Sequence, residues 1–139
     1  MNKKISALFL FVISAILIIV YINHLKSENR KDFVLEELTD AARNTQSIWA
    51  RPQMMGGAGK DFNNLNEIEI LREVFRGTAG FEAHNESISN NNGIYTLEII
   101  SSIEIAFKGV TKNEQHEVKA RVKRNNETEE WDIEFKEDE

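Results

Sequence analysis

ISALFLFVISAILIIVYI, residues Ile5 to Ile22, is an unbroken run of 18 residues without a charge, a proline or a glycine. At about 1.5 Å per residue, a helix of this length covers about 27 Å, close to the roughly 30 Å hydrocarbon core of a bilayer. The run is longer than the apolar core of a cleavable signal peptide, and Val20 to His24 offers no small-residue cleavage site. We therefore predict a retained membrane anchor over residues 1–25, whose lipid contacts include Ile5, Phe9, Val12, Ile16, Ile19 and Ile22.

Basic residues stand on both sides of this run, so counting them does not orient the anchor. Two lysines precede it and three basic residues follow it, namely Lys3, Lys4, Lys26, Arg30 and Lys31. The four residues before the run cannot form a domain, whereas the rest of the chain can. We therefore expect a single-pass protein of a cell inner membrane, with membrane lipid as a partner and its C-terminal domain outside the cytoplasm.

Composition limits what the remaining residues, 26–139, can be. They suffice for one small domain with a modest core. The absence of cysteine excludes disulfides, thiolate catalysis and cysteine-ligated metals. The net charge of −6 becomes −8 when Lys3 and Lys4 are set aside, which argues against nucleic acid as a partner. Acidic residues crowd the C-terminal end and are typical of a solvated edge: Glu127, Glu129, Glu130, Asp132, Glu134, Glu137, Asp138 and Glu139.

Residues 27–50 have the pattern of an amphipathic helix that continues the anchor without a break. Apolar and small residues recur every three to four positions on one face, namely Val34, Leu38, Ala41 or Ala42, Thr45 and Trp49. Arg51 precedes Pro52 and is therefore disfavoured in helical geometry, so the helix should stop near Ala50. The apolar face of this second half requires something to pack against.

Glycines break the pattern after the helix. Residues 52–61 form a predicted loop, MMGGAGK at its centre, which is not a phosphate-binding loop because Met54 stands where its first glycine belongs and Asp61 replaces the Ser or Thr. A short helix is predicted over 65–76 from the spacing of Leu65, Ile68, Leu71, Val74 and Phe75.

From Gly93 to residue 137 the apolar period changes to two, which indicates antiparallel strands with one apolar face. Four such strands are expected, with inward residues Tyr95, Leu97, Ile99; Ile103, Ile105, Phe107; Val118, Ala120, Val122; and Trp131, Ile133, Phe135. The amphipathic helix is the natural cover for this face. The predicted fold is thus α+β, a long N-terminal helix packed on a four-stranded antiparallel sheet, with Trp49 and Trp131 meeting in the core.

Charge suggests how the strands pair. Setting Val122 opposite Trp131 makes every outward pair opposite in sign, and the neighbouring hairpin, with Phe107 opposite Val118, brings Lys108 to Glu117 and Glu104 to Arg121. The second pairing implies a tight turn at Lys112-Asn113. The first hairpin, with Ile99 opposite Ile103, is less regular, so a bulge or bend near Ser101-Ser102 is the alternative.

This architecture resembles the type IV pilin-like family. The stretch Leu38-Thr39, Ala42, Gln46, Arg51-Pro52, Met55-Gly56-Gly57, Gly59 and Phe62 is similar to a segment of small anchored pilin-like proteins of the Bacteroidetes and Chlorobi lineages. The likeness continues through Gly93-Ile94-Tyr95-Thr96. The chain departs from filament-forming pilins, because no glycine precedes the apolar run and no carboxylate lies within it.

The resemblance implies a non-enzymatic structural or assembly protein of a type IV pilus or a type II secretion-like system. Its partners would be like subunits or the pilus or secretion platform. The alternative is a solitary anchored module that captures an envelope partner. The loop residues Met54, Met55, Gly56, Gly57 and Gly59 would suit partner contact, although the glycines also serve a sharp chain reversal.

Catalytic and metal-binding signatures find little support in the sequence. The histidines His24, His84 and His116 are far apart, and no Ser/His/Asp or paired-carboxylate pattern stands out. His84 with Glu86, and His116 with Glu117, would bind a metal only if the fold united them. We therefore predict no enzyme activity, no cofactor, no metal and no small-molecule substrate.

Overall fold

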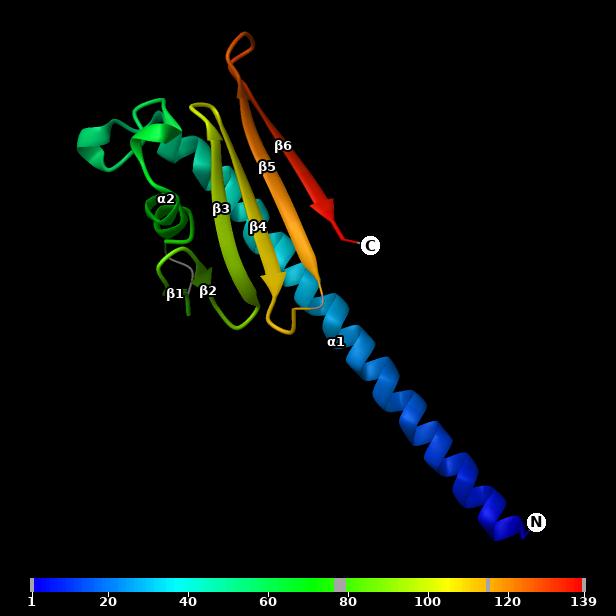
Figure 1. Cartoon of the computed structure of the whole chain (residues 1–139). Helices are drawn as coiled ribbons and strands as arrows, with labels where there is room; N and C mark the ends of the chain where they lie inside the picture. The colour runs from blue at the N-terminus through cyan, green and yellow to red at the C-terminus, as the bar shows by residue number, and fades with distance from the viewer. Residues whose placement is uncertain (1, 77–79, 115, 139) are drawn as a thin grey trace.

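The computed structural model describes residues 2–76, 80–114 and 116–138 (Figure 1). Its first helix, α1, spans Lys3–Ala50 and joins the apolar run to the amphipathic half without interruption. It begins where the side-chain oxygen of Asn2 accepts a hydrogen bond from the backbone N–H of Lys4 at 3.2 Å. It ends at Ala50 because Arg51, which precedes Pro52, has an extended backbone with ψ of 134°.

Three short helices follow α1: the 3-10 helices η1 (Gln53–Met55) and η2 (Phe62–Asn64), and the α-helix α2 (Glu67–Val74). A capping box starts α2, since the Asn66 side chain accepts from the Glu69 backbone N–H and the Glu69 side chain accepts from that of Asn66. This helix is shorter at both ends than the predicted 65–76. It buries Ile70, Leu71 and Val74.

The strands form one antiparallel sheet in chain order, made of β1 (Glu82–Ala83), β2 (Ile88–Ser89), β3 (Gly93–Ser101), β4 (Glu104–Thr111), β5 (Glu117–Asn125) and β6 (Glu130–Glu137). The long helix and the antiparallel sheet are confirmed, whereas the prediction of four strands is wrong. The two additional strands have two residues each and lie in a polar segment. β2 pairs with β3, with Ile88 opposite Tyr95, and β1 pairs with β2, with Ala83 opposite Ile88. A period-two pattern cannot reveal such short pairings.

The predicted pairing is wrong by two residues in all three long hairpins. The observed pairs are Val122 opposite Ile133, Phe107 opposite Ala120, and Ile99 opposite Ile105. A shift of two leaves every side chain on its predicted face, so the apolar pattern does not distinguish the registers. The expected irregularity near Ser101 is present as a register shift between Ile99 and Ser101.

The turns account for the difference at the β5–β6 hairpin. The Asn125 side-chain oxygen accepts the backbone N–H groups of Glu127 and Thr128 at 3.0 and 3.3 Å, and Glu129 has a left-handed φ of +60°. These interactions build a loop of residues 126–129 between the paired residues Asn125 and Glu130. Such side-chain to backbone bonds favour this loop over a tighter turn.

The observed register places Lys119 opposite Lys136, a like-charge pair that the charge argument disfavoured. The Lys119 Nζ atom instead lies 3.3 Å from a carboxylate oxygen of Glu117 on its own strand. Arg121 still meets Glu104, diagonally, through three contacts of 2.7 to 3.0 Å. Lys108 likewise lies 3.9 Å from Glu117, so both predicted ion pairs between β4 and β5 are kept after the register has moved. The ion pairs predicted between β5 and β6 are not found among the described residues.

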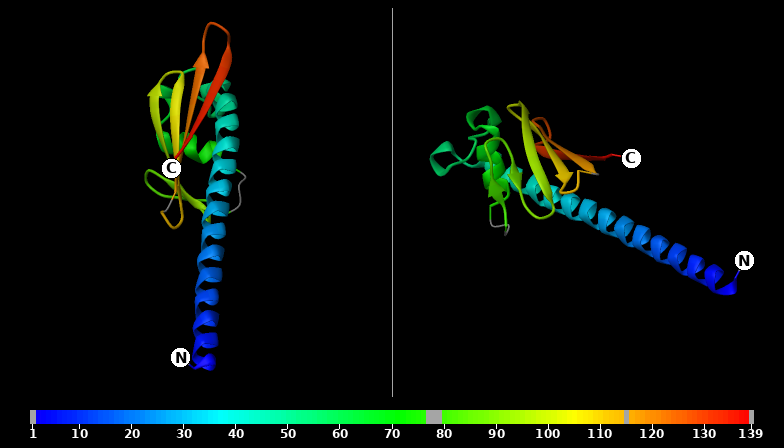
Figure 2. Two further views of the ribbon diagram at one scale, coloured as in Figure 1. Left: turned by 90° about the vertical axis from the view of Figure 1, so that its right-hand side faces the viewer. Right: turned by 60° about the horizontal axis from the view of Figure 1, so that its bottom comes forward.

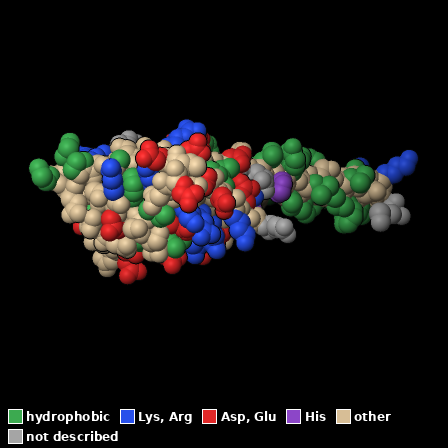
Figure 3. Space-filling view, turned by 90° about the horizontal axis from the view of Figure 1, so that it is seen from above, with side chains coloured by type: hydrophobic (Ala, Val, Ile, Leu, Met, Phe, Trp, Pro, Cys, Tyr) green, Lys and Arg blue, Asp and Glu red, His purple; other side chains and the backbone are tan. Residues whose placement is uncertain are grey.

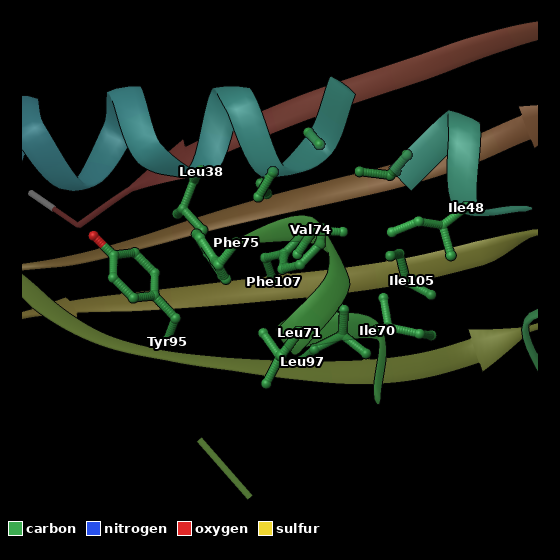
Figure 4. Packing of buried hydrophobic residues seen from close by; sticks show 14 of the residues in the cluster. Leu38, Ile48, Ile70, Leu71, Val74, Phe75, Tyr95, Leu97, Ile105 and Phe107 are labelled. Carbon is green, nitrogen blue, oxygen red and sulfur yellow. The ribbon is translucent and has the colours of Figure 1, made fainter. Parts of the chain in front are cut away.

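The core lies between the sheet and a layer of two helices. The second half of α1 packs on β4 and β5, and α2 packs on β3 beside it (Figure 2). Figure 4 shows Leu38 and Ile48 of α1, and Leu71 and Val74 of α2, directed at the same sheet face. The sheet contributes the buried residues Tyr95, Leu97, Ile105, Phe107, Val118, Ala120 and Val122.

Aromatic contacts close the end of the core that is distant from the apolar half of α1. The rings of Trp49 and Trp131 meet edge to face with centroids 5.5 Å apart, so the predicted contact is confirmed. The indole N–H of Trp49 donates to the backbone oxygen of Ser102 at 3.0 Å. The guanidinium of Arg124 lies 4.4 Å from the centre of the Trp49 ring.

The inward face of β6 is less covered than predicted. Trp131 and Ile133 are half-buried, and Phe135 is 41% exposed although it was expected to be buried. The reason is that α1 packs mainly on β4 and β5, and meets β6 through the Trp49–Trp131 contact and the Lys31–Glu137 ion pair at 3.1 Å, on either side of Phe135.

α1 and β4 approach closely at the end of the core nearest the apolar half of α1. A Cβ atom added to Gly109 would lie 2.6 Å from a methyl carbon of Val34, closer than side chains pack. Val34 itself is fully buried. Glycine at position 109 therefore sets how near α1 can come to β4.

A partly buried polar cluster fixes the same region. The Glu37 carboxylate accepts hydrogen bonds from the Tyr95 hydroxyl and from the side-chain amides of Asn90 at 2.8 Å and Asn92 at 2.9 Å. Burial, and then the hydrogen bond to Glu37, raise the pKa of Tyr95 well above its ordinary value. One carboxylate of α1 thereby holds both β3 and the turn before it.

We predict that Gly109→Ala destabilises the protein by about 1–3 kcal/mol, because the added methyl group collides with Val34. The measurement is denaturant unfolding of the full chain in detergent, followed by tryptophan fluorescence. Adding Val34→Ala should relieve the collision, so the double variant should lose less stability than the sum of the two single changes. Strictly additive losses would contradict the close approach.

We also predict a pH effect of Tyr95. Because its pKa is raised in the folded protein, the stability it confers is complete below pH 10, about where an unfolded tyrosine ionises, and is lost as the pH rises further, by up to about 1.4 kcal/mol per unit. Tyr95→Phe should cost about 1 kcal/mol at neutral pH and flatten the decline above about pH 10. Tyr21→Phe, in the apolar half of α1, is the control and should keep the wild-type slope in the same unfolding assay.

Candidate functional site

Residues 3–25 of α1 project from the folded domain and pack on nothing within the described structure (Figures 1 and 2). All six predicted anchor residues are exposed, by 43 to 66% of their surface: Ile5, Phe9, Val12, Ile16, Ile19 and Ile22. Figure 3 shows the projecting part covered with hydrophobic side chains, whereas the domain shows mixed acidic and basic ones. Such an exposed apolar patch is far larger than a soluble surface tolerates.

This part of α1 is long and apolar enough to cross a membrane. A lipid environment would cover its side chains, and a helix satisfies its own backbone hydrogen bonds there. The hydroxyl of Ser14, the polar side chain in the middle of the run, donates to the backbone oxygen of Leu10 at 2.9 Å. The projecting helix is therefore a candidate single-pass anchor.

The glycine-containing loop folds back on the end of α1. Backbone N–H groups of Ala58, Gly59 and Lys60 donate to the oxygens of Ile48, Arg51 and Trp49 at 2.7 to 2.9 Å. The last turn of a helix leaves carbonyl groups without intrahelical partners. The loop supplies two of those partners, at Ile48 and Trp49, and is thereby fixed to α1.

Two glycines make this return possible. A Cβ atom on Gly57 would lie 2.2 Å from the backbone oxygen of Arg51, so no larger residue fits without displacing the chain. Gly56 has a left-handed φ of +80°, which L side chains rarely adopt. The expectation that the glycines serve a sharp reversal accounts for these two positions.

The same loop displays two methionines at the distal end of the molecule. Met54 is 97% exposed and Met55 is 69% exposed, both in η1. The loop lies at the opposite end of the molecule from the N-terminus (Figure 1). Apolar side chains held by a hydrogen-bonded loop and turned to water have the character of a contact surface.

The histidines do not form a site with one another. The His84 Nε2 atom lies 2.9 Å from the Ser89 hydroxyl, and the His116 Nδ1 atom lies 3.9 Å from a carboxylate oxygen of Asp138. His24 is exposed on α1. Within the described residues, no group of three or more His, Asp or Glu side chains is placed to hold a metal ion.

A shallow hollow of about 790 Å³ lies on the outer face of the sheet, between charged side chains and over Ala106. The observed register aligns Lys108, Lys119 and Lys136 across three strands along its border. The predicted pairing of these strands does not contain this row, because it differs from the observed register by two residues. Glu98 and Glu134 border the same hollow, so its charge is mixed and does not single out one ligand.

Comparison with protein-family models, with curated proteins and with solved structures finds no match to this chain. The long N-terminal helix packed on an antiparallel sheet is compatible with a pilin-like fold.

Proposed function

We propose that this chain is a non-enzymatic, membrane-anchored pilin-like protein that acts in a structural or assembly role, as part of a type IV pilus or a type II secretion-like system. The observation that supports this most is α1 itself. It is one unbroken helix, apolar and exposed in its first half and packed against the sheet in its second. A folded domain is thus joined to a helix that only lipid or other apolar helices can cover.

The proposed place is a cell inner membrane, with the domain of residues 26–139 outside the cytoplasm. Lys3 and Lys4 would then lie on the cytoplasmic side, and Lys26 at the opposite surface. Protease treatment of intact spheroplasts should digest the domain. Protection of the domain would reverse the proposed orientation.

The second candidate function is a solitary anchored module that binds an envelope partner. The exposed Met54 and Met55 favour it, because their loop is held rigidly and points away from the anchor. The two candidate functions differ in the partners that α1 and the loop of residues 52–61 would contact. A structural subunit contacts copies of itself or its platform through α1, whereas a module needs α1 only for attachment.

Mechanical shearing of cells tests the leading proposal. A filament or platform component should appear in the sheared fraction or in a high-mass detergent complex on an immunoblot. Recovery of the protein solely as a detergent-solubilised monomer would favour the solitary module. Mass spectrometry of the mature N-terminus adds a second readout, since trimming with methylation accompanies pilin processing.

The anchor can be tested by charge. We predict that Ile13→Arg with Ile16→Arg releases the protein from membranes on alkaline carbonate extraction, because each arginine at the centre of a spanning helix costs about 2.5–3.5 kcal/mol on insertion scales. Ile13→Leu with Ile16→Leu is the matched control and should stay in the membrane pellet. Retention of the double arginine variant would contradict a spanning helix.

The loop can be tested separately. We predict that Met54→Ser with Met55→Ser leaves the free energy of unfolding within about 0.5 kcal/mol of wild type, since both side chains are exposed. The same pair should abolish crosslinks formed in cells by a photoreactive residue at Gln53. Ile100→Ser, which alters an exposed apolar residue on the sheet, is the control and should leave them intact. Crosslinks that survive the double change would remove the loop from the contact surface.

A further inference from the structure

The outer edge of β6 is open along its length. In the part of the chain that the structure describes, β6 pairs with β5 on one side and with no strand on the other. Figure 1 shows it as the outermost strand of the sheet. An unpaired edge presents a row of N–H and C=O groups to which another strand can bind.

The hydrogen-bond pattern shows which backbone groups face outward. The backbone N–H of Asp138 donates to the oxygen of Glu117 at 3.1 Å, in the same register that pairs Lys136 with Lys119. Because bonding direction alternates along an antiparallel strand, the even-numbered residues of β6 bond to β5. The backbone groups of Trp131, Ile133, Phe135 and Glu137 therefore face the open edge.

The side chains of Trp131, Ile133 and Phe135 form a partly covered apolar row, followed by Glu137, which pairs with Lys31 of α1 at 3.1 Å. Trp131 contacts Trp49 and Phe62, Ile133 is half-buried, and Phe135 is 41% exposed. Cover thus decreases toward the C-terminal end of β6. A further strand beside β6 would place its inward side chains next to this row and remove it from water.

The outer face of β6 is acidic from Glu130 to Glu134 and then carries Lys136. Glu130, Asp132 and Glu134 alternate with the apolar row, and within the described residues none of the three forms an ion pair. Arg121 lies opposite Glu134 and Lys123 lies opposite Asp132, but the Arg121 guanidinium bonds to Glu104 and interacts with Glu134 only electrostatically. Three carboxylates at the spacing of a strand are therefore available to basic side chains of a neighbour.

The strand already paired with β6 has the matching pattern. β5 carries Lys119, Arg121 and Lys123 outward and Val118, Ala120 and Val122 inward. Antiparallel pairing with a second copy of β6 centred on Asp132 or Ile133, which would overlap the acidic row, is disfavoured because it would set Asp132 opposite itself or Glu134. Like charges directly opposite one another destabilise a sheet.

We propose that the open edge of β6 binds an extended segment of another polypeptide by strand addition. That segment alternates lysine or arginine on the outer face with aliphatic residues facing α1. Main-chain hydrogen bonds hold it, the aliphatic residues cover Phe135, and the basic residues meet the three carboxylates. This interaction does not depend on whether the protein is a filament component or a solitary module.

The experiment uses the full chain, labelled with ¹⁵N, in zwitterionic detergent, with the peptide KVKVKVK as probe. Binding should slow hydrogen exchange of the outward amides of Ile133 and Phe135, which are open to water in the free protein. The acidic peptide EVEVEVE, and VVVKKKK with the same composition but no alternation, are the control ligands. Neither control peptide should bind the protein or slow hydrogen exchange at these amides.

Variants separate charge from backbone pairing. Glu130→Gln, Asp132→Asn and Glu134→Gln together should weaken KVKVKVK binding about tenfold, equivalent to about 1.4 kcal/mol. Glu98→Gln, Glu114→Gln and Glu127→Gln, which remove the same charge elsewhere, should leave it unchanged. Phe135→Pro removes an outward N–H without breaking the bonds to β5 and should abolish binding, whereas Phe135→Ser keeps the N–H and should only weaken it.

Three results would overturn the proposal. The first is unchanged exchange at Ile133 and Phe135 when the peptide is added. The second is equal binding of the alternating and non-alternating lysine peptides, which would indicate attraction by net charge alone. The third is protection of these amides that grows with protein concentration in the absence of peptide, which would make a second copy the occupant.

Discussion

The packing of the second half of α1 on β4 and β5 is the interaction on which the rest of this structure depends. It buries Val34, Leu38 and Ala42 against the sheet and leaves the first half of the same helix without a protein surface to cover it. Gly109 lets the helix approach closely at one end, and the Trp49–Trp131 contact closes the other. Because Glu37 also bonds to Tyr95 and two asparagines, rotation of α1 about its axis would break a partly buried cluster as well as apolar contacts.

The distal loop belongs to the same construction. Its amides take the hydrogen bonds that the last turn of α1 cannot make within the helix, and Gly57 allows the chain to lie against Arg51. The exposure of Met54 and Met55 is thus a property of an ordered loop, not of a loose one. Anchor and distal surface are consequently two ends of one continuous element.

Sequence periodicity was sufficient to predict the helix, its end before Pro52, the apolar face of the four long strands and the meeting of the two tryptophans. Periodicity failed to predict the strand register, which hydrogen bonds in the turns determine. A two-residue shift leaves residues such as Val122 and Ile133 on the same face, so only turn geometry, such as the bonds of the Asn125 side chain, selects the register. The strands β1 and β2 are too short to carry a pattern of their own. The exposure of Phe135 depends on which strands α1 covers, and the sequence around Phe135 does not indicate this.

The unbroken course of α1 through residue 50 has a mechanical consequence. About 25 residues of α1, from 26 to 50, separate the candidate anchor of residues 1–25 from the loop, a lever of about 38 Å at 1.5 Å per residue. Spanning helices incline by about 20° on average as they adjust to bilayer thickness, and that inclination carries the far end of such a lever sideways by about 13 Å. In a bilayer that the apolar half of α1 would span, lipid thickness would therefore change the reach of Met54 and Met55, because the helix runs unbroken from Lys3 to Ala50.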